Sequence, residues 1–408
     1  MSPVAPDELR FVGAADVFKG GRLAARLVRE SAAVRFQYFA DYLEVAATVP
    51  VATTLPLSEE PMHTRSPGAV PPFFAGLLPE GRRLSALRRA VKTSADDDLT
   101  LLLAVGSDTI GDVQVVPVGE TPDPAAVAVE TADFSELRFA DLYADMTGER
   151  LVPARAGIPG VQVKASARMI SLPVRRAHER YLLKLDPPEY RHLVENEAFF
   201  LAAARASGLR AAQAEIVHDA TGRAGLLVHR FDRIDADGAS LMLAQEDACQ
   251  VLGRYPADKY RLPAAEVVAG LAGVTGAPVV AARELVRQLA FAYVTANGDA
   301  HAKNFSVLRD PDGEWRVSPA YDVPSSHPYG DHSMALRING KIDESIGRAD
   351  FVALGESIGV RPRATERVLA ELTERVDTWL PALAELPFEE RTVHRLRRTI
   401  EYRRARLA

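Results

Sequence analysis

The residue types and spacing near position 300 are those of a phosphoryl-transfer site. Asp299 and Asn304 have the spacing Asp-x4-Asn, and a second carboxylate, Asp322, follows them. In phosphoryl transfer, one Asp orients or deprotonates the attacking hydroxyl, while an Asn and another Asp bind the Mg²⁺ that holds the nucleotide phosphates. The catalytic loop of protein kinases has the same Asp-x4-Asn spacing. These three residues therefore predict an ATP-dependent kinase.

The sequence around the three residues also predicts how they are positioned. A helix is expected over residues 279–297, and two short apolar runs, 305–309 and 315–318, flank the turn Asp-Pro-Asp-Gly. This turn sequence favours a β-hairpin between the two runs. Such a hairpin would return Asp322 toward Asp299.

A lysine within an apolar strand is a candidate for binding the nucleotide phosphates. Lys184 interrupts the run 181–185, and a buried ammonium group costs free energy unless it is paired or faces a cleft. A lysine that protects an edge strand from aggregation is an equally good interpretation. In kinases this lysine pairs with a Glu on the following helix, and Glu195 and Glu197 in the predicted helix 194–209 are candidates. Acids that only complement the helix dipole are the alternative.

Glycines before this strand could approach phosphates closely. The run 157–166 contains Gly160 and Lys164, and a glycine-rich backbone can present N–H groups to phosphate oxygens. The offsets differ from those of a Walker A loop, so an ordinary β-turn is the competing interpretation. Farther on, strands are expected at 215–218 and 225–233, and the charged end of the second lies where a kinase hinge would contact adenine.

The composition excludes several classes of protein. The chain has 408 residues, of which 47% are hydrophobic and 25% charged, as is typical of a folded protein of two or three domains. The net charge of −6 gives no general attraction to nucleic acid or anionic lipid. A single cysteine, Cys249, excludes a disulfide framework and a Cys-based zinc cluster, and a buried structural thiol is favoured over a nucleophile. The N-terminus has no signal-like segment and no run of about 18 apolar residues follows, so a cytoplasmic protein is expected, with no membrane contact.

The order of predicted elements separates a small N-terminal unit from the rest. Residues 9–56 and 106–115 contain short strands and turns, and the Pro/Gly/Ala-rich run 117–132 is expected to be a linker. A helix is expected at 246–253, and another from about residue 388 to the end. The arginines of this final helix are Arg391, Arg395, Arg397, Arg398, Arg403, Arg404 and Arg406. A solvated face is favoured there, with a partner or DNA-backbone contact as the alternative.

Three histidines raise the question of a metal cluster. His301, His327 and His332 could be combined with Asp322 and Asp331. Their spacing matches no zinc-binding set, so hydrogen-bonding support of the catalytic loop is favoured.

An ordered set of short motifs resembles the HipA-type serine/threonine kinase toxins over nearly the whole chain. In chain order the motifs are Gly160-Val161-Gln162-x-Lys164, Lys184-Leu185, Glu195-Asn196-Glu197, Arg230-Phe231-Asp232-Arg233, Gln245-Glu246-Asp247, Asn297-Gly298-Asp299-x-His301-x-Lys303-Asn304 and Tyr321-Asp322. Residues 71–79 with 106–111 are similar to the small N-terminal subdomain of that family.

The resemblance implies an α+β protein with a two-lobed, protein-kinase-like fold. A small β-rich N-terminal subdomain and linker would occupy residues 1–135, and an ATP-binding N-lobe residues 136–232. A mainly helical C-lobe with the catalytic and metal-binding loops would occupy residues 233–408.

The resemblance also implies roles for individual residues. By position, Asp299 matches the catalytic base, Asn304 and Asp322 match the Mg²⁺ ligands, and Lys184 matches the phosphate-binding lysine. The other residues implied to bind ATP are Gly160, Gln162, Lys164, Arg230, Phe231, Asp232, His301 and Lys303. Of these, Lys303 would steady the transferred phosphoryl group.

Two positions depart from the best-known members of the family. Those members autophosphorylate a Ser three residues before the first Gly of the Gly-x-Gln loop, which switches the kinase off; here that position is Gly157. A switch of this kind would need another residue, such as Ser166. At the hinge, a position often held by an acidic residue is His229.

The resemblance leads to a functional hypothesis with alternatives. It implies a serine/threonine kinase toxin of a type II toxin–antitoxin pair, with a small helix-turn-helix antitoxin (HipB-like) through which the chain would meet DNA. Its protein substrate would be a translation component such as an aminoacyl-tRNA synthetase. One alternative is a DNA-associated corepressor with a weak or vestigial kinase site. A lipid or small-molecule kinase is another, although no amphipathic membrane segment favours it.

Overall fold

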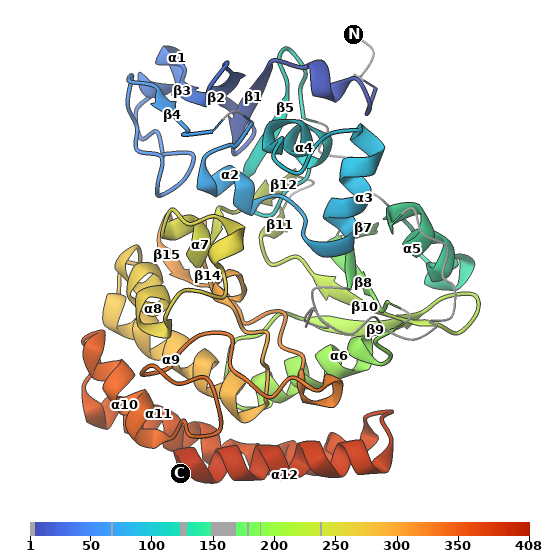
Figure 1. The fold of residues 1–408 in the computed structure, drawn as a ribbon, viewed down its shortest axis with the longest axis vertical. Coiled ribbons are helices and arrows are strands. Elements are labelled where there is room, and N and C mark those ends of the chain that lie inside the picture. The colour runs from blue at the N-terminus through green and yellow to red at the C-terminus, as the bar shows by residue number, and fades with distance from the viewer. Residues whose placement is uncertain are drawn as a thin grey trace.

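The computed structural model describes residues 5–66, 68–122, 129–147, 169–177, 179–187, 189–236 and 239–408. Figure 1 shows a β-rich N-terminal region at one end of the molecule and helices of the C-terminal region at the other. The predicted mixture of a β-rich N-terminal part and a mainly helical C-terminal part is confirmed. None of the helices in the described ranges combines the length and apolar character needed to cross a bilayer.

The N-terminal subdomain is built on a five-stranded antiparallel sheet with the order β4-β3-β2-β1-β5. Its strands are β1 (Ala14–Lys19), β2 (Arg22–Arg29), β3 (Val34–Tyr38), β4 (Met62–His63) and β5 (Val113–Pro117). Its helices are α1 (Ala40–Leu43), α2 (Pro72–Gly76), α3 (Gly81–Val91) and α4 (Asp98–Val105). The β1–β2 turn needs the left-handed backbone of Gly20 and Gly21, which have φ values of 54° and 77°. Leu27, Phe36 and Phe74 are buried in the core of this subdomain.

A second sheet has the order β6-β7-β8-β10-β9, and only the β6–β7 pairing is parallel among its described pairs. Its strands are β6 (Val129–Glu130), β7 (Ile170–Arg176), β8 (Glu179–Leu185), β9 (Ala214–His218) and β10 (Ala224–His229). Helices α5 (Phe139–Thr147) and α6 (Leu193–Ala206) accompany it. The run predicted as a linker thus ends in strand β6, which joins this sheet.

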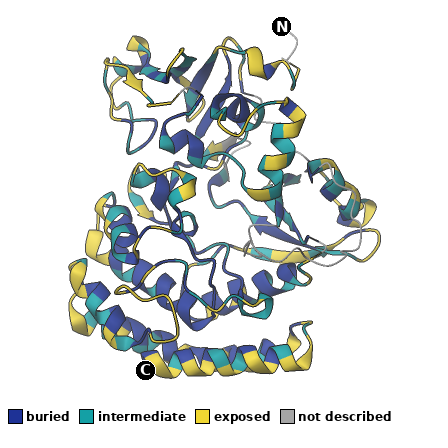
Figure 2. Ribbon diagram, in the orientation of Figure 1, coloured by how far each residue is buried: buried dark blue, intermediate teal, exposed yellow. Residues whose placement is uncertain are grey.

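The C-terminal lobe has a small sheet, β13-β14-β15, and a group of helices. The strands are β13 (Gln245–Asp247), β14 (Ser306–Arg309) and β15 (Trp315–Val317), next to the hairpin β11 (Arg233–Ala236) and β12 (Ala239–Met242). The helices are α7 (Ala248–Val251), α8 (Ala264–Gly273), α9 (Pro278–Val294), α10 (Arg348–Ser357), α11 (Pro362–Arg375) and α12 (Glu390–Leu407). Figure 2 shows that dark, buried residues concentrate inside this lobe, while α12 exposes one face.

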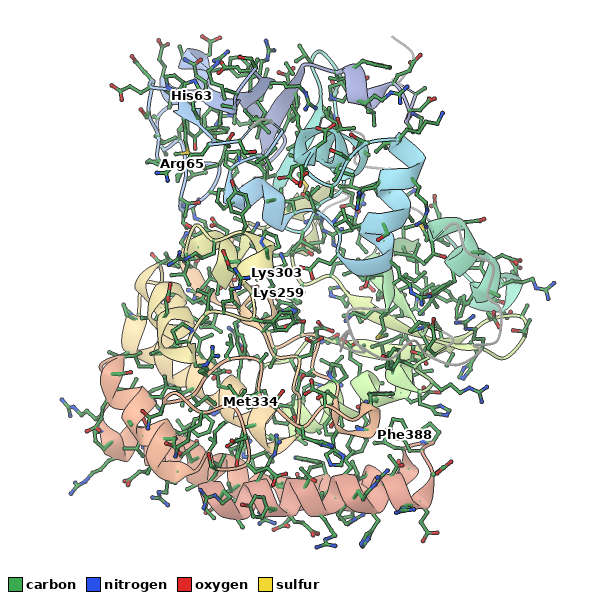
Figure 3. All side chains as sticks on the ribbon, viewed as in Figure 1. His63, Arg65, Lys259, Lys303, Met334 and Phe388 are labelled. Carbon is green, nitrogen blue, oxygen red and sulfur yellow. The ribbon has the colours of Figure 1, made fainter. Side chains whose placement is uncertain are left out.

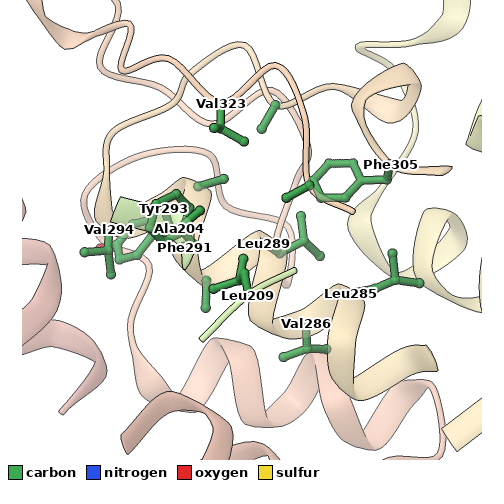
Figure 4. Packing of buried hydrophobic residues seen from close by; sticks show 14 of the residues in the cluster. Ala204, Leu209, Leu285, Val286, Leu289, Phe291, Tyr293, Val294, Phe305 and Val323 are labelled. Carbon is green, nitrogen blue, oxygen red and sulfur yellow. The ribbon is translucent and has the colours of Figure 1, made fainter. Parts of the chain in front are cut away.

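Helix α9 is the centre of this lobe. Leu285, Leu289 and Phe291 of α9 are buried against residues such as Leu209, as Figure 4 shows. The helix begins one residue before the predicted range 279–297 and ends three residues before the end of that range, and the predicted hairpin is present as β14 and β15. The helix predicted at 246–253 is partly wrong, because residues 245–247 form β13, which pairs with β14 before α7 begins.

Candidate active site

The catalytic motif begins where α9 ends. Ala296 takes a left-handed conformation with φ 54°, and the Asn297 N–H donates to the Ala292 carbonyl at 2.9 Å, which closes the helix. The Asn297 side chain then accepts the Asp299 N–H at 3.0 Å. Gly298 is packed so closely that an added Cβ would lie 2.6 Å from the Ser333 carbonyl oxygen. This packing fixes the direction of Asp299.

Asp299 faces a cleft and is only 6% exposed. The Tyr260 hydroxyl donates to Asp299 Oδ1 at 2.7 Å, and the Tyr260 ring makes an edge contact with the His301 ring at 5.1 Å. Burial and the charge of Lys259 lower the pKa of His301 well below its ordinary value, so the imidazole is neutral at neutral pH. A neutral His301 places no positive charge beside the Tyr260–Asp299 hydrogen bond.

The two predicted metal ligands lie next to each other. Asn304 Nδ2 donates to Asp322 Oδ2 at 2.6 Å, and Asn304 Oδ1 accepts the His301 N–H at 3.0 Å. The hairpin β14–β15 brings Asp322 back to Asn304, and Asp322 itself has a φ of 55°. Magnesium in kinase sites is bound through one or two carboxylates and the substrate phosphates, so one carboxylate and one carboxamide fit it.

Lys184, on strand β8 of the second sheet, contacts Asp322. Its Nζ donates to Glu197 Oε1 at 2.7 Å and to Asp322 Oδ1 at 3.1 Å. Of the two acids on α6, Glu197 is therefore the partner of the strand lysine, whereas Glu195 lies near His192. The lysine predicted on sequence grounds faces the cleft.

The pKa values in this group follow from burial and pairing. Burial opposes the ammonium of Lys184, but Asp322 and Glu197 outweigh it and raise its pKa. Burial would raise the pKa of Asp322, but Lys184 holds it below the ordinary value. Burial raises the pKa of Glu197 to about 7 against the opposing effect of Lys184. Asp322 is thus ionised at neutral pH, as the predicted role of metal ligand requires.

Two adjoining cavities, of about 250 and 340 Å³, meet at Lys184 and Asp322. The first is mainly apolar and includes Leu182, Val228 and Tyr321, which suits a flat base. The second is lined by Lys184, Asp299, His301, Asn304 and Asp322 together with apolar side chains. The arrangement separates an apolar compartment from the compartment that holds Asp299.

The residues predicted beside adenine border the apolar cavity, but two of their side chains have other partners. Phe231 packs against the Tyr321 ring, with centroids 5.9 Å apart. Arg230 is 4% exposed and pairs with Asp232 and Asp108, both at 2.7 Å. These charges connect the N-terminal subdomain to the segment 230–233, and the contact of Arg230, Phe231 and Asp232 with adenine stays a prediction.

Lys303 also has protein partners. Its Nζ donates to Asp247 Oδ2 at 2.8 Å and to the Gly76 carbonyl at 2.9 Å. Lys259 and Glu80, which the sequence did not single out, form an ion pair beside it. No local pattern marked these two residues, because they lie on loops that come together only in the folded chain. Figure 3 places Lys259 and Lys303 between the N-terminal subdomain and the helical lobe.

Other residues predicted from the sequence either lie away from the two cavities or are outside the described part of the chain. Gly157, Gly160, Gln162, Lys164 and Ser166 are outside the described residues. His327 and His332 have ring centroids 4.5 Å apart, and His327 contacts Thr399 of α12. Across the described ranges, no group of three or more His, Cys, Asp or Glu side chains is arranged to hold a metal ion.

Comparisons with known proteins give consistent matches. Residues 156–380 match the HipA-like C-terminal domain, and residues 15–116 match the HipA N-terminal domain. Y4mE of Sinorhizobium fredii, a protein named as a kinase, is 30% identical over 393 residues that cover 91% of each chain. The serine/threonine-protein kinase toxin HipA of Shewanella oneidensis is 26% identical over 357 residues, 80% of this chain and 79% of the toxin.

A solved structure shares the fold. The complex of Shewanella oneidensis HipA, HipB and operator DNA contains a chain that matches 96% of this chain and 97% of its own length, with a TM-score of 0.78 and 22% identity. The predicted two-lobed, kinase-like fold is therefore confirmed.

Proposed function

The chain belongs to the family of HipA-like kinases, and we propose that it is an ATP- and Mg²⁺-dependent serine/threonine protein kinase. The observation that carries the proposal is the meeting of Lys184, Asn304 and Asp322 in one cleft with Asp299. Each has the chemistry that phosphoryl transfer requires at its position.

In the proposed reaction the protein orients the acceptor and receives its proton. The acceptor hydroxyl oxygen attacks the γ-phosphorus, and Asp299 takes the hydroxyl proton. Lys184 binds the α- and β-phosphates, and Glu197 holds Lys184 in place. Mg²⁺, when bound to Asn304 and Asp322, would neutralise the charge of the phosphates.

The proposal extends to a biological role. Relatives include a protein named as a kinase toxin, and the fold matches a HipA solved with HipB and operator DNA. We therefore propose a toxin of a type II toxin–antitoxin pair, with a small helix-turn-helix antitoxin and DNA contact through it. The proposed substrate class is a translation component such as an aminoacyl-tRNA synthetase, and the proposed compartment is the cytoplasm.

Transfer of labelled γ-phosphate from ATP tests the kinase proposal. Asp299→Asn and Asp322→Asn are each expected to lower the rate by about 10²–10⁴-fold, because each removes a carboxylate used in transfer. Asp312→Asn is the control, since Asp312 lies in the turn between β14 and β15, and its side chain is 52% exposed. Unchanged transfer in both site variants, with circular dichroism showing a folded chain, would end the assignment.

The corepressor alternative predicts a different result. A vestigial site would bind no Mg²⁺-ATP in calorimetry, whereas an active kinase binds it. The described contacts of α12 reduce the basic surface on which the alternative depends, because Arg403 is buried and Arg404 pairs with Asp377.

A further inference from the structure

Lys259 lies on the catalytic side of the cleft, and its acidic partner comes from the N-terminal subdomain. The Lys259 ammonium pairs with Glu80, which precedes α3. The Lys259 side chain is only 10% exposed and lines the same cavity as Asp299 and Asp322. Its backbone carbonyl accepts the Ala302 N–H at 3.1 Å, which fixes this loop to the catalytic segment.

The three lysines of the cleft differ in how strongly they are held. Lys184 has two carboxylates, Glu197 and Asp322. Lys303 has Asp247 at 2.8 Å and a backbone carbonyl, with Glu80 at 3.9 Å. The carboxylate within ion-pair distance of Lys259 is Glu80, whose side chain is 32% exposed. Lys259 is therefore the ammonium group that a phosphate could most easily recruit.

The position of Lys259 also favours contact with the group in transfer. Its Nζ lies 5.2 Å from the ring centroid of Tyr260, and the Tyr260 hydroxyl donates to Asp299. Its charge is also one cause of the lowered pKa of His301, next to the catalytic base. The charge thus lies beside the tyrosine that contacts Asp299, in the cavity that Lys184 also lines.

We infer that Lys259 is a further catalytic residue, whose ammonium stabilises the phosphoryl group during transfer, and that Glu80 is a positioning residue that holds Lys259. The inference rests on the proposed kinase function. During the step the acceptor oxygen bonds to the γ-phosphorus, and the bond from that phosphorus to the β–γ bridging oxygen breaks. The electron pair leaves with ADP and the proton goes to Asp299. Lys259 stabilises the negative charge on the non-bridging γ-oxygens, as a lysine point charge can.

Steady-state kinetics with ATP and dephosphorylated casein as acceptor give the first test. Lys259→Met is expected to lower kcat by about 10²-fold with a change in the KM for ATP below about threefold, because the contact is made mainly in the transition state. Lys259→Arg should restore part of kcat, because it keeps the charge. Lys341→Met is the matched control, since Lys341 pairs with Asp350 at 2.9 Å away from the cleft; its kcat should stay within about twofold of the wild type.

Glu80→Gln separates positioning from catalysis. The single change is expected to lower kcat by roughly three- to tenfold. It should cause no further loss in the Lys259→Met background, because the lysine that Glu80 positions is then absent, while Lys303 keeps Asp247 at 2.8 Å. In Lys259→Met alone, Glu80 loses the lysine it pairs with, which could destabilise the fold. The double variant removes both charges of the pair and therefore avoids this unpaired carboxylate.

A transition-state analogue gives a test that needs no acceptor. Binding of Mg²⁺-ADP with aluminium fluoride should weaken in Lys259→Met by about the same factor as kcat, while binding of Mg²⁺-ADP alone should not change. Equal kcat and equal analogue binding in wild type and Lys259→Met would overturn the inference, as would an equal loss of ADP binding. If wild type, Asp299→Asn and Asp322→Asn all transfer phosphate equally, the kinase proposal itself fails.

Discussion

Asp299 and Asp322 have the same side chain but different neighbours, and the neighbours separate their proposed roles. Asp322 contacts Lys184 and Asn304, and its lowered pKa keeps it ionised, which suits its proposed role as a metal ligand. Asp299 contacts the Tyr260 hydroxyl through one carboxylate oxygen. The hydrogen bond to Oδ1 restrains the rotation of the carboxylate that is proposed to receive the proton of an acceptor.

The Tyr260–Asp299 contact makes a testable prediction at the scale of one residue. Tyr260→Phe removes the hydroxyl and leaves the ring, so the Asp299 carboxylate gains rotational freedom. We expect kcat to fall by roughly tenfold and the free energy of unfolding to fall by about 1–2 kcal/mol, the cost of losing a hydrogen bond to a charged group. The measurements are steady-state kinetics and urea denaturation. A kcat equal to that of the wild type would show that Tyr260 does not position the base.

Helix α6 contributes two consecutive buried polar residues to the site. Asn196 is 0% exposed and Glu197 is 1% exposed. Glu197 holds Lys184, while the Asn196 side chain donates to the Ser325 carbonyl at 2.8 Å and accepts the Ser325 N–H at 3.0 Å. One helix thus positions both Lys184, the proposed phosphate-binding lysine, and the loop that follows Asp322.

Asn196→Ala is expected to loosen this loop. The change leaves the Ser325 N–H and carbonyl without their partner, at a cost of about 1–3 kcal/mol for each buried group. A mobile loop should also raise the KM for Mg²⁺-ATP more than it lowers kcat. The control is Ala202→Ser on the exposed face of the same helix. Equal urea midpoints for Asn196→Ala and Ala202→Ser would contradict this role.

The sequence predicted the parts of the site that depend on local structure. Asp299, Asn304 and Asp322 could be placed together because a helix end and a hairpin connect them within a short segment. The sequence could not decide between Glu195 and Glu197 as the partner of Lys184. Residues two positions apart face different sides of a helix, and the side of α6 that faces Lys184 is set by tertiary packing. β13 was missed because its partner β14 is far away in sequence. The approach of Glu80 to Lys259 depends on the docking of the N-terminal subdomain, which leaves no local signal.

At the scale of the whole molecule, charged contacts hold the N-terminal subdomain against the rest of the chain close to the cleft. Glu80 pairs with Lys259, and Thr53 donates two hydrogen bonds to Glu246. A further contact is a buried group of two acids and two arginines: Asp108, Asp232, Arg230 and Arg233. The predicted boundaries after residues 135 and 232 stay a prediction, and this group has members on both sides of each boundary.

The change Asp232→Asn tests the connection between the N-terminal subdomain and the rest of the chain. Burial would raise its pKa, but Arg230 and Arg233 outweigh burial and lower the pKa to about 2. Asp232→Asn leaves two buried guanidinium groups with Asp108 as their remaining acid, so we expect a loss of about 3–5 kcal/mol. Asp377→Asn is the control, because Asp377 also pairs with an arginine but is 67% exposed; its loss should stay below about 1 kcal/mol.

The pH dependence of this loss has a defined sign. A carboxyl group with a lowered pKa stabilises the folded state above about pH 4 and loses that effect as the pH falls toward about 2. The loss of unfolding free energy in Asp232→Asn should therefore be constant from about pH 8 to about pH 5, whereas a loss that grows on acidification within this range would contradict the assignment.

Both tryptophans, Trp315 and Trp379, lie in the C-terminal lobe. Tryptophan fluorescence therefore reports that lobe, while circular dichroism reports the whole chain. In urea the midpoints of the fluorescence and circular dichroism transitions should differ more in Asp232→Asn than in the wild type. The reason is that the variant weakens the buried ion-pair group that connects the N-terminal subdomain to the rest of the chain.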